Sequence, residues 1–561
     1  MNLSIDSDYL ILKTDRELSE PYLTKTRHGD YRAYWHFVRD LLFDYGDFIE
    51  ITDEIKTIIR SKVDEVRNTK KILYDNIDIE KYSKYFCNDL KQYPFQAKAV
   101  EFIIKQKKVL LADDMGLGKS VQAITVMLHL IETEGVMKFL VVVPASLRRQ
   151  WLSECRKFIN RKMFPDIELI INDKSKGERH YVYKNFIATD NPVILITSYD
   201  LIRHDSEKIK ELASHVNMII LDEAQKIKTR KTKINKVIRK LFMDTEYKLA
   251  MTATPIENGL EDLYCICEFL DSRRLRSKTY FEKKYCIVES YRLWHRNINI
   301  LKVVGYKNIK DVKEKLAGMY IRRTVDNVSL ELPDIIKQNI TLQLTDRQRR
   351  MYDEITGKIY GEMTRDDILG QFVKLQEVCD STELLDAGIK SSVKLEELKR
   401  LVNEDLKYCK IVIISYFKTF AKIIKKELKT CNPILITSET NMEKRELFIK
   451  DFNNNPDRRI LIGTEAIQEG LNLQVASILI NVDLPWNPSK YFQRIGRIRR
   501  INSEHNTVRI INLITEETME QHILEVLYAK GELFEKMFHR DEDVKIGSLL
   551  GMSKEQLLGM M

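Results

Sequence analysis

The chain of 561 residues lacks the features that would place it in a membrane or outside the cell. No stretch approaches the ~20 predominantly apolar residues that a membrane-spanning helix requires. The segment Met1–Asp6 shows no basic stretch followed by an apolar one, so we do not expect export. The eight cysteines are scattered without a Cys-x-x-Cys pair, and Cys265 and Cys267 should point in different directions on a helix. These absences favour a reduced compartment, and we expect a cytoplasmic protein.

The sequence also lacks a strong charge imbalance, internal repeats and low-complexity tracts. Its net charge of +9 arises from 92 basic and 83 acidic residues, which permits a polyanionic partner but is mild for this length. The hydrophobic fraction of 44% is ordinary for a globular protein. A chain of this length is too long for one hydrophobic core, and it predicts several domains.

Two sets of short apolar segments, alternating with helical patterns, predict the fold class. The first set comprises Val109–Ala112, Phe139–Val143, Val193–Thr197, Met218–Leu221 and Tyr247–Met251. The second set comprises Ile411–Ser415, Ile434–Thr437, Ile460–Gly463, Ile478–Val482 and Val508–Leu513. Nearly continuous runs of Val, Ile and Leu are typical of parallel strands covered on both faces. We therefore predict an α/β chain with two lobes, each containing a parallel sheet.

The other segments predict helical and accessory regions. Residues 1–88 are rich in aromatic and charged residues and contain no chemical motif. Apolar residues at helical spacing, including Val38, Leu41, Ile55 and Ile58, favour a small, mainly helical accessory region. The resulting division is an accessory region at 1–88, a first lobe at 89–270, a helical insertion and linker at 271–390, a second lobe at 391–535 and a tail at 536–561.

The run Asp113–Ser120 joins an apolar strand to a helical pattern through a glycine turn. This order is typical of loops that bind nucleotide phosphates at the start of a helix. The glycines let the backbone approach phosphate oxygens, the lysine can reach the β- and γ-phosphates, and the serine can hold magnesium. The commonest form of the loop has glycine where this chain has Asp113. The predicted nucleotide-binding residues of the loop are Asp114, Met115, Gly116, Leu117, Gly118, Lys119 and Ser120.

A second apolar strand ends in two carboxylates, Asp222 and Glu223. Magnesium-dependent phosphoryl transfer needs such a pair, because the first carboxylate can bind the metal and the second can orient or deprotonate the attacking water. The alternative is an acidic, solvent-exposed loop. The position of the pair after a phosphate loop favours the catalytic interpretation.

Two further segments are weaker indications. Gln96 lies just before the phosphate loop, where its amide could read the adenine edge. Thr252 and Thr254 follow another apolar strand and place hydroxyl groups at its end. A Thr/Pro turn is usually only a turn, so neither segment decides the function alone.

In this order, the segments resemble the first motor lobe of superfamily-two helicases and translocases, and most closely the Swi/Snf branch. The segments that carry the resemblance are Asp113–Ser120, Pro144–Leu147 with Trp151, Thr197–Tyr199, Asp222–Lys228 and Met251–Asn258. The resemblance implies that Gln225, Thr252, Thr254 and Gly470 couple hydrolysis to movement. Lys228–Lys233 could be mistaken for a nuclear import signal, but it continues the acidic motif as in the family, and we do not expect import.

The run Gln493–Arg500 follows Gly470–Leu473 and Asp483–Pro488, an order seen in the second lobe of the same family. The alternative is a basic helix that faces solvent or phosphate backbone. The resemblance implies two RecA-like lobes, with Arg497 and Arg500 as arginine fingers for ATP and Gln493 near the nucleotide. A guanidinium aimed at the γ-phosphoryl group can be worth about 10³–10⁵ in rate.

Other segments similar to the family are Ile321–Thr324 and Ser391–Leu395. The chain departs from the family pattern at Ala466–Gln468, where Ala-Gly-Gly is usual, and at Arg499, where histidine is common. These departures concern coupling and the second lobe rather than the predicted ATP site.

Family resemblance also implies a groove for double-stranded DNA. The candidate contacts are Ser146, Arg148, Ser198, Tyr199 and Thr464. Hydroxyls, amides and cations in such loops would grip phosphates rather than bases, so we expect little sequence preference. Arg148 could equally be an ordinary surface charge.

The leading interpretation is a Swi/Snf-type translocase that uses ATP and Mg²⁺ to move on double-stranded DNA. One alternative is a strand-separating DNA or RNA helicase. Another is a nucleic-acid-binding scaffold that does not hydrolyse ATP, which the intact Lys119, Asp222, Glu223, Arg497 and Arg500 disfavour. No histone-reading module or nuclease site can be identified, which favours a bacterial or viral setting. The sequence does not specify the pathway or a recruiting protein.

Overall fold

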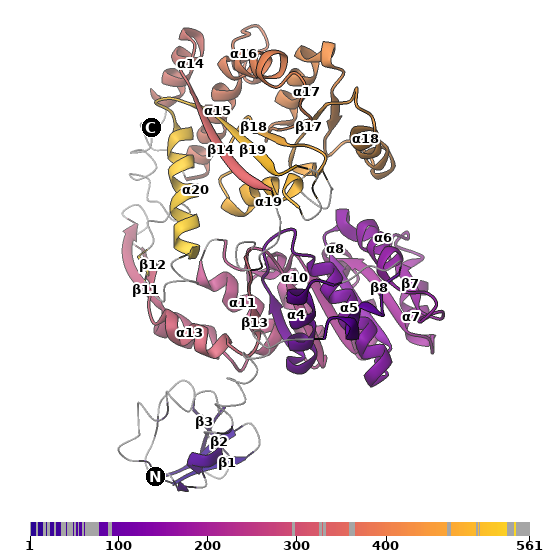
Figure 1. The fold of residues 1–561 in the computed structure, drawn as a ribbon. Helices are drawn as coiled ribbons and strands as arrows, with labels where there is room; N and C mark the ends of the chain where they lie inside the picture. The colour runs from indigo at the N-terminus through magenta and orange to yellow at the C-terminus, as the bar shows by residue number, and fades with distance from the viewer. Residues whose placement is uncertain are drawn as a thin grey trace. The chain divides into compact units, whose positions relative to one another are not determined.

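The computed structural model divides the chain into two compact units, one formed mainly by residues 1–324 and the other mainly by residues 325–535. Each unit contains a parallel sheet with helices packed against it (Figure 1). No helix in the described part of the chain combines the length and the apolar composition needed to cross a membrane. The structure describes residues 2–6, 9–14, 18, 23–26, 30–34, 41, 49, 52–53, 55–58, 61, 78–87, 92–257, 259–293, 298–324, 328, 333–357, 365–467, 473–500, 503, 505–535 and 544–545.

The sheet of the first unit is parallel throughout, in the order β13-β5-β10-β9-β6-β8-β7. Its strands are β5 Lys108–Leu111, β6 Lys138–Val143, β7 Glu168–Ile171, β8 Val193–Ser198, β9 Met218–Asp222, β10 Tyr247–Met251 and β13 Tyr320–Ile321. All five strands predicted for the first lobe are confirmed. The edge strands β7 and β13 have no counterpart in the prediction, because β7 is only half-buried and β13 is two residues long.

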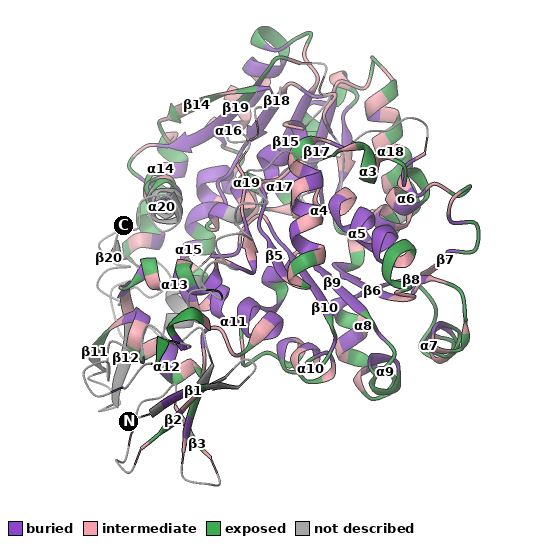
Figure 2. Cartoon of the chain, turned by 60° about the horizontal axis from the view of Figure 1, so that its bottom comes forward, coloured by how far each residue is buried: buried purple, intermediate pink, exposed green. Residues whose placement is uncertain are grey.

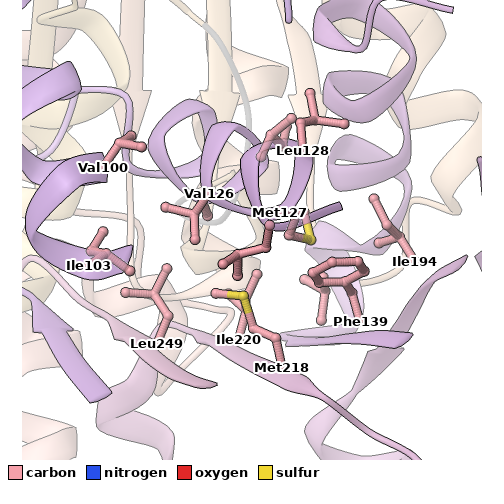
Figure 3. Packing of buried hydrophobic residues seen from close by; sticks show 14 of the residues in the cluster. Val100, Ile103, Val126, Met127, Leu128, Phe139, Ile194, Met218, Ile220 and Leu249 are labelled. Carbon is pink, nitrogen blue, oxygen red and sulfur yellow. The ribbon is translucent and has the colours of Figure 1, made fainter. Parts of the chain in front are cut away.

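Helix α5 packs on this sheet and thereby positions the loop that enters it. In Figure 3, Val126 and Met127 of α5 lie over Ile220 of β9 and Leu249 of β10. The central strands are buried along nearly all of their length, whereas α7 and α9 expose their outer faces (Figure 2). The helices of the sheet region are α4 Pro94–Gln106, α5 Lys119–Glu134, α6 Arg148–Phe158, α7 Arg179–Ala188, α8 Tyr199–His204, α9 Ser206–Ala213, α10 Lys233–Leu241 and α11 Leu260–Asp271.

The second unit also contains a parallel sheet, in the order β14-β19-β18-β15-β17-β16. Its strands are β14 Asp334–Leu342, β15 Ile411–Ile414, β16 Ile434–Ile436, β17 Ile460–Gly463, β18 Ile478–Asn481 and β19 Thr507–Thr515. Its helices are α14 Asp346–Gly357, α15 Arg365–Asp380, α16 Val393–Arg400, α17 Lys418–Glu427, α18 Met442–Asn454, α19 Pro488–Ile498 and α20 Met519–Glu535. The five strands predicted for the second lobe are confirmed.

Strand β14 extends the second sheet into the segment 271–390 that was predicted as insertion and linker. It pairs with β19 over its full length, from Asp334 opposite Thr507 to Leu342 opposite Thr515. All of its residues are exposed or half-buried, as expected for an edge strand, so it lacks the buried apolar run by which the other strands were predicted. The second sheet therefore begins well before residue 391.

The accessory region differs from the helical prediction. Its strands β1 Asn2–Asp6, β2 Tyr9–Lys13, β3 Thr24–Lys25 and β4 Tyr31–Tyr34 form an antiparallel sheet in the order β1-β2-β4-β3. Leu10 and Leu12 are buried, which is the two-residue period of a strand. The apolar residues whose spacing predicted helices begin at Val38, which lies outside the described residues. Leu41, Ile55 and Ile58 of the same set are helical in the structure.

A hairpin also interrupts the predicted helical insertion. Strands β11 Cys286–Leu293 and β12 Ile298–Tyr306 pair antiparallel between helices α12 Lys278–Tyr285 and α13 Ile309–Leu316. The short strand β20 Val544–Lys545 adds to β12. The hairpin is rich in β-branched and aromatic residues, which suit a pleated surface, so the prediction of a helical segment is wrong here.

Candidate active site

The phosphate loop leaves β5 and enters α5, as predicted. Gly116 and Gly118 have φ angles of +87° and +72°, which side chains other than glycine rarely adopt. A Cβ atom at Gly118 would also overlap the amide nitrogen of Gln96. Gln96 is held beside the loop because its Oε1 accepts a hydrogen bond from the Tyr93 backbone N–H at 3.2 Å. Contact between Gln96 and adenine stays a prediction.

Lys119 is the first residue of α5, and its ammonium group points back onto the loop. Its Nζ donates to the backbone carbonyls of Asp113 at 2.7 Å and Asp114 at 3.1 Å. Burial lowers the pKa of Lys119, and the charges of Asp113, Glu223, Asp222 and Asp114 oppose that change. The carboxylates that oppose it include the two predicted catalytic residues, Asp222 and Glu223. The amides of the first turn of α5 lack intrahelical acceptors, as at the start of any helix, and they add to an anion-binding environment.

Asp113, which departs from the usual loop sequence, is fully buried and paired with Arg323. Arg323 Nε donates to Asp113 Oδ1 at 2.9 Å, and its Nη2 donates to Oδ2 of the same carboxylate. Gln122 of α5 joins them, accepting from Arg323 at 2.8 Å and donating to Asp113 at 3.2 Å. Arg323 also lies over the Phe95 ring, 5.0 Å from its centroid. The carboxylate thus replaces the usual glycine with a buried anchor.

The neighbouring residues secure the same loop. The backbone N–H groups of Ala112 and Asp114 donate to the carbonyls of Ile321 at 2.7 Å and Arg323 at 2.9 Å. These bonds continue the pairing of β13 with β5 into the phosphate loop. Arg322 lies 3.3 Å from the Asp114 carboxylate and donates to the Ala112 carbonyl at 3.2 Å. The sequence marked Ile321–Thr324 only as a family-like segment, and its role in bracing the loop was not predicted.

Replacing Arg323 by alanine should destabilise the first unit by about 3–5 kcal/mol, because it leaves the Asp113 carboxylate buried without its partner. Urea unfolding of the full chain will measure the change. The double variant Asp113→Ala/Arg323→Ala should lose less than Arg323→Ala alone. Lys107→Ala, which breaks an exposed pair with Glu246, is the control and should cost no more than about 1 kcal/mol. Equal losses for Arg323→Ala and the control would contradict the buried-anchor interpretation.

Asp222 ends β9 and is held by three hydrogen bonds. Its Oδ2 accepts from Trp151 Nε1 at 2.8 Å, and its Oδ1 accepts from the Glu223 backbone N–H at 3.0 Å. The Tyr199 hydroxyl donates to its backbone carbonyl at 2.8 Å. Desolvation and the neighbouring Glu223 raise the pKa of Asp222 to about 7, against the effects of Trp151 and Lys119.

Glu223 belongs to a chain of hydrogen bonds that reaches the end of β10. The Gln225 amide donates to Glu223 Oε2 at 2.6 Å, and Gln225 Oε1 accepts from the Thr252 hydroxyl at 2.7 Å. Thr252 Oγ1 in turn accepts from the Thr254 backbone N–H at 3.0 Å. The structure thus brings together Gln225, Thr252 and Thr254, whereas Gly470, the fourth predicted coupling residue, lies outside the described residues.

The donor set of this region fits magnesium. Ser120 offers a hydroxyl and Asp222 a carboxylate, and hard oxygen ligands are what Mg²⁺ prefers. In the described part of the chain, no cluster of three or more His, Cys, Asp or Glu side chains could hold a metal ion. A cation here would take few protein ligands, as is usual when a nucleotide's phosphates supply the others.

In the second unit, α19 presents Gln493 and Arg497 one turn apart on the same side of the helix. Arg500 follows the helix, and its Nε donates to the Gly496 carbonyl at 3.2 Å. Arg494 has a different role, because it is fully buried and donates to the Asp483 carbonyl at 2.7 Å. Of the four arginines in this run, Arg494 is an anchor and Arg499 donates to the Pro333 carbonyl at 2.9 Å, whereas Arg497 and Arg500 are the predicted fingers, whose role stays a prediction.

The predicted nucleic-acid contacts are mostly engaged within their own units. Ser198 and Thr464 are buried, and Ser198 caps α8 by accepting from the Leu201 backbone N–H. Tyr199 is buried with its hydroxyl on Asp222, and Arg148 donates to the Asn172 carbonyl. Ser146 is half-buried. In this structure, packing and capping occupy the side chains of Ser198, Tyr199 and Thr464, and their contact with DNA phosphates stays a prediction.

Comparison with known proteins identifies related chains. The chain is 27% identical over 481 residues to the uncharacterized ATP-dependent helicase YqhH of Bacillus subtilis, covering 80% of each chain. It is 26% identical over 533 residues to the uncharacterized ATP-dependent helicase MG018 of Mycoplasma genitalium, covering 93% of this chain but 48% of that one. The human SWI/SNF-related matrix-associated actin-dependent regulator of chromatin subfamily A member 1 is 25% identical over 447 residues, covering 74% of this chain and 40% of its own.

A solved structure, the Sulfolobus solfataricus SWI2/SNF2 ATPase core in complex with dsDNA, is 26% identical, with 82% of this chain and 95% of that chain covered and a TM-score of 0.38. The model of the helicase conserved C-terminal domain matches residues 393–502. The model of the SNF2-related domain matches residues 95–384, which is more than half of the 561 residues. The chain belongs to the SNF2-related family of helicase-like ATPases.

Proposed function

We propose that the chain couples ATP hydrolysis to movement along double-stranded DNA. The observation that carries the proposal is the continuous set of interactions from the phosphate loop to the coupling residues. The Thr252 backbone N–H donates to the Leu111 carbonyl at 3.1 Å, at the end of β5 where the phosphate loop begins, and Glu223 is linked to Thr252 through Gln225. A hydrolysis site joined by hydrogen bonds to the next strand end can pass a local change to the rest of its unit.

In this proposal, each residue of the first unit has a separate task. Lys119 and the amides of the first turn of α5 bind the triphosphate, and Gly118 lets the backbone approach it. Ser120 and Asp222 would hold Mg²⁺, which supplies charge neutralisation at the β- and γ-phosphates when bound. Glu223 orients the attacking water or accepts its proton.

Arginines of the second unit complete the proposed chemistry. By family resemblance, Arg497 and Arg500 act on the γ-phosphoryl group, whose charge is greatest in the transition state. Gln493, one turn before Arg497 on α19, is proposed to approach the same nucleotide. Placing catalytic groups in both units makes hydrolysis depend on their movement, which is how a motor links turnover to translocation.

Double-stranded DNA is the partner that we propose. The human relative is named a SWI/SNF-related regulator of chromatin, and the Bacillus relative an ATP-dependent helicase. The net charge of +9 is compatible with a polyanion. Stimulation of ATP turnover by duplex DNA, compared with single strands, forks and RNA at equal nucleotide concentration, tests this proposal. We expect the largest stimulation with duplex DNA, and preferential stimulation by RNA or single strands would contradict it.

Displacement of a third strand from a triplex, without unwinding of a labelled duplex, would distinguish a translocase from a strand-separating helicase. We expect triplex displacement that requires ATP and is lost in Lys119→Ala. ATP-dependent unwinding of labelled blunt and forked duplexes, at a rate similar to that of triplex displacement, would favour the strand-separating helicase instead.

Binding to duplex DNA should depend strongly on salt and little on sequence, because phosphate contacts release counterions. A protein that contacts about four phosphates loses about 10²-fold in affinity between about 50 and 200 mM salt. Titration of labelled duplexes of equal length and unrelated sequence will measure both effects. Strong preference for one short sequence, or an affinity that does not change with salt, would contradict phosphate-based binding.

A further inference from the structure

The metal-binding candidate Asp222 is held by side chains from the helices that follow two other strands of its sheet. Strands β9, β6 and β8 are neighbours, with Leu221 opposite Val142 and Val143 opposite Ser198. Trp151 lies in the helix that follows β6, and Tyr199 directly follows β8. Both therefore reach Asp222 from the same carboxyl edge of the sheet.

The two contacts fix different parts of Asp222. Trp151 bonds the carboxylate at 2.8 Å, and Tyr199 bonds the backbone carbonyl at 2.8 Å. Both rings are buried, with 2% and 6% of their surface exposed, so the bonds are shielded from water. An indole has a single N–H to donate, and Trp151 gives it to Asp222. The pair thus constrains both the direction of the carboxylate and the direction of the peptide that leads to Glu223.

That peptide leads to an unusual backbone conformation. Glu223 has a φ of +53°, in the left-handed region that residues with a side chain seldom adopt. Such a conformation persists only where the surroundings hold it, and it is common at functional sites. Tyr199 holds the peptide on one side, and Gln225 holds the Glu223 carboxylate on the other. A shift of Tyr199 or Trp151 would therefore re-aim Glu223.

The other ends of these elements lie at the surface. Trp151 is in the first turn of α6, which follows the turn Ala145–Leu147, and Ala145 and Arg149 are exposed. Tyr199 is the first residue of α8, and the next residue, Asp200, is exposed. These are the segments to which family resemblance assigns DNA contact, although several of their side chains are occupied internally. Each buried ring is thus one turn or less from a surface segment.

We infer that Trp151 and Tyr199 are positioning residues that transmit DNA binding at segments 145–149 and 199–203 to Asp222 and Glu223. This inference rests on the proposed function. DNA that moves the start of α6 or α8 would change the hydrogen bonds to Asp222, and through them the aim of the carboxylate that activates water. The nucleotide site would then respond to DNA without any direct contact between DNA and the catalytic carboxylates.

Hydrogen–deuterium exchange of the full chain tests the inference without nucleotide or metal. Duplex DNA should slow amide exchange in the peptide that spans Met218–Lys228 of the wild type. The double variant Trp151→Phe/Tyr199→Phe keeps the rings but removes both donors, and at a DNA concentration that saturates the variant it should lose this DNA-dependent protection. If duplex DNA stimulated ATP turnover of the wild type but left amide exchange in Met218–Lys228 unchanged, the inference would be overturned.

ATP turnover provides the second measurement. Trp151→Phe and Tyr199→Phe should each lower DNA-stimulated turnover about 10- to 100-fold and raise the half-saturating Mg²⁺ concentration, as loss of a residue that orients a metal ligand does. Tyr247→Phe is the matched control, because it removes a tyrosine hydroxyl that donates to the Glu134 carboxylate. Tyr247 is the first residue of β10, so it lies at the amino ends of the strands, away from Asp222. This control should retain wild-type turnover and Mg²⁺ dependence.

The outcomes separate the inference from the proposed function. If no nucleic acid stimulates wild-type turnover, the proposed function fails and the inference with it. If DNA stimulates the wild type and both single variants equally, only the inference fails. A parallel loss of thermal stability and DNA affinity in the variants, with unchanged Mg²⁺ dependence, would indicate a purely structural role and would also overturn it.

Discussion

Replacing Arg497 by alanine is expected to lower DNA-stimulated ATP turnover about 10³–10⁵-fold while nucleotide binding is retained. The charge on the γ-phosphoryl oxygens is greatest in the transition state, so a guanidinium aimed there stabilises that state more than bound ATP. Arg497→Lys should recover little, because an ammonium lacks the planar donor fork. Steady-state turnover and titration with a fluorescent nucleotide will measure the two effects separately.

The variant Arg497→Ala tests the arginine-finger role selectively, because a different arginine anchors helix α19. Arg494 anchors α19 by donating to Asn481 at 3.1 Å and to the Asp483 carbonyl at 2.7 Å, and it is untouched in Arg497→Ala. Helix α19 should therefore keep its position when the Arg497 side chain is truncated to alanine. Arg509→Ala, at an exposed position of β19, is the control for the loss of one positive charge. Turnover in Arg497→Ala close to that of this control would exclude the arginine-finger role, and Arg500→Ala tests the second finger in the same way.

The predictable part of the fold is the part that is buried on both faces. Central strands such as β6 and β9 are nearly continuous apolar runs, so their positions follow from the sequence alone. Strand β14 is an edge strand whose residues are all exposed or half-buried, and its pairing with β19 depends on a partner far along the chain. The accessory sheet was not predicted, because its strands are at most five residues long and are held by pairing with one another, which a short segment does not reveal by itself.

The predictable part of the site is the part encoded in consecutive residues. A glycine turn before Lys-Ser and a pair of adjacent carboxylates are each recognisable as short motifs. The roles of Lys119, Asp222 and Glu223 could therefore be predicted from the sequence. The partners that hold them could not, because Asp113 meets Arg323 only after β13 pairs with β5. Burial was equally hidden: Tyr199 was assigned to DNA as a loop residue, whereas its hydroxyl bonds the Asp222 carbonyl.

Glu223→Gln should lower ATP turnover about 10²–10⁴-fold, the usual contribution of a positioned general base, without loss of nucleotide binding. Glutamine has the shape of glutamate and its amide oxygen can still accept from Gln225, so the hydrogen bonds to Thr252 can persist. The Asp222 carboxylate, with its bonds from Trp151 and Tyr199, is unchanged in this variant. The expected result is a chain that binds Mg²⁺ and ATP but hydrolyses slowly.

Two comparisons make the Glu223 result specific. Lys119→Ala should instead weaken nucleotide binding, because it removes the cation beside the phosphate loop. Glu246→Gln removes a carboxylate that pairs with Lys107 at the surface, and it should hydrolyse ATP at the wild-type rate. If Glu223→Gln also kept the wild-type rate, another group would have to activate the water. The hydrogen-bond chain from Gln225 to Thr252 would then serve to hold the fold rather than to report the state of the catalytic carboxylate.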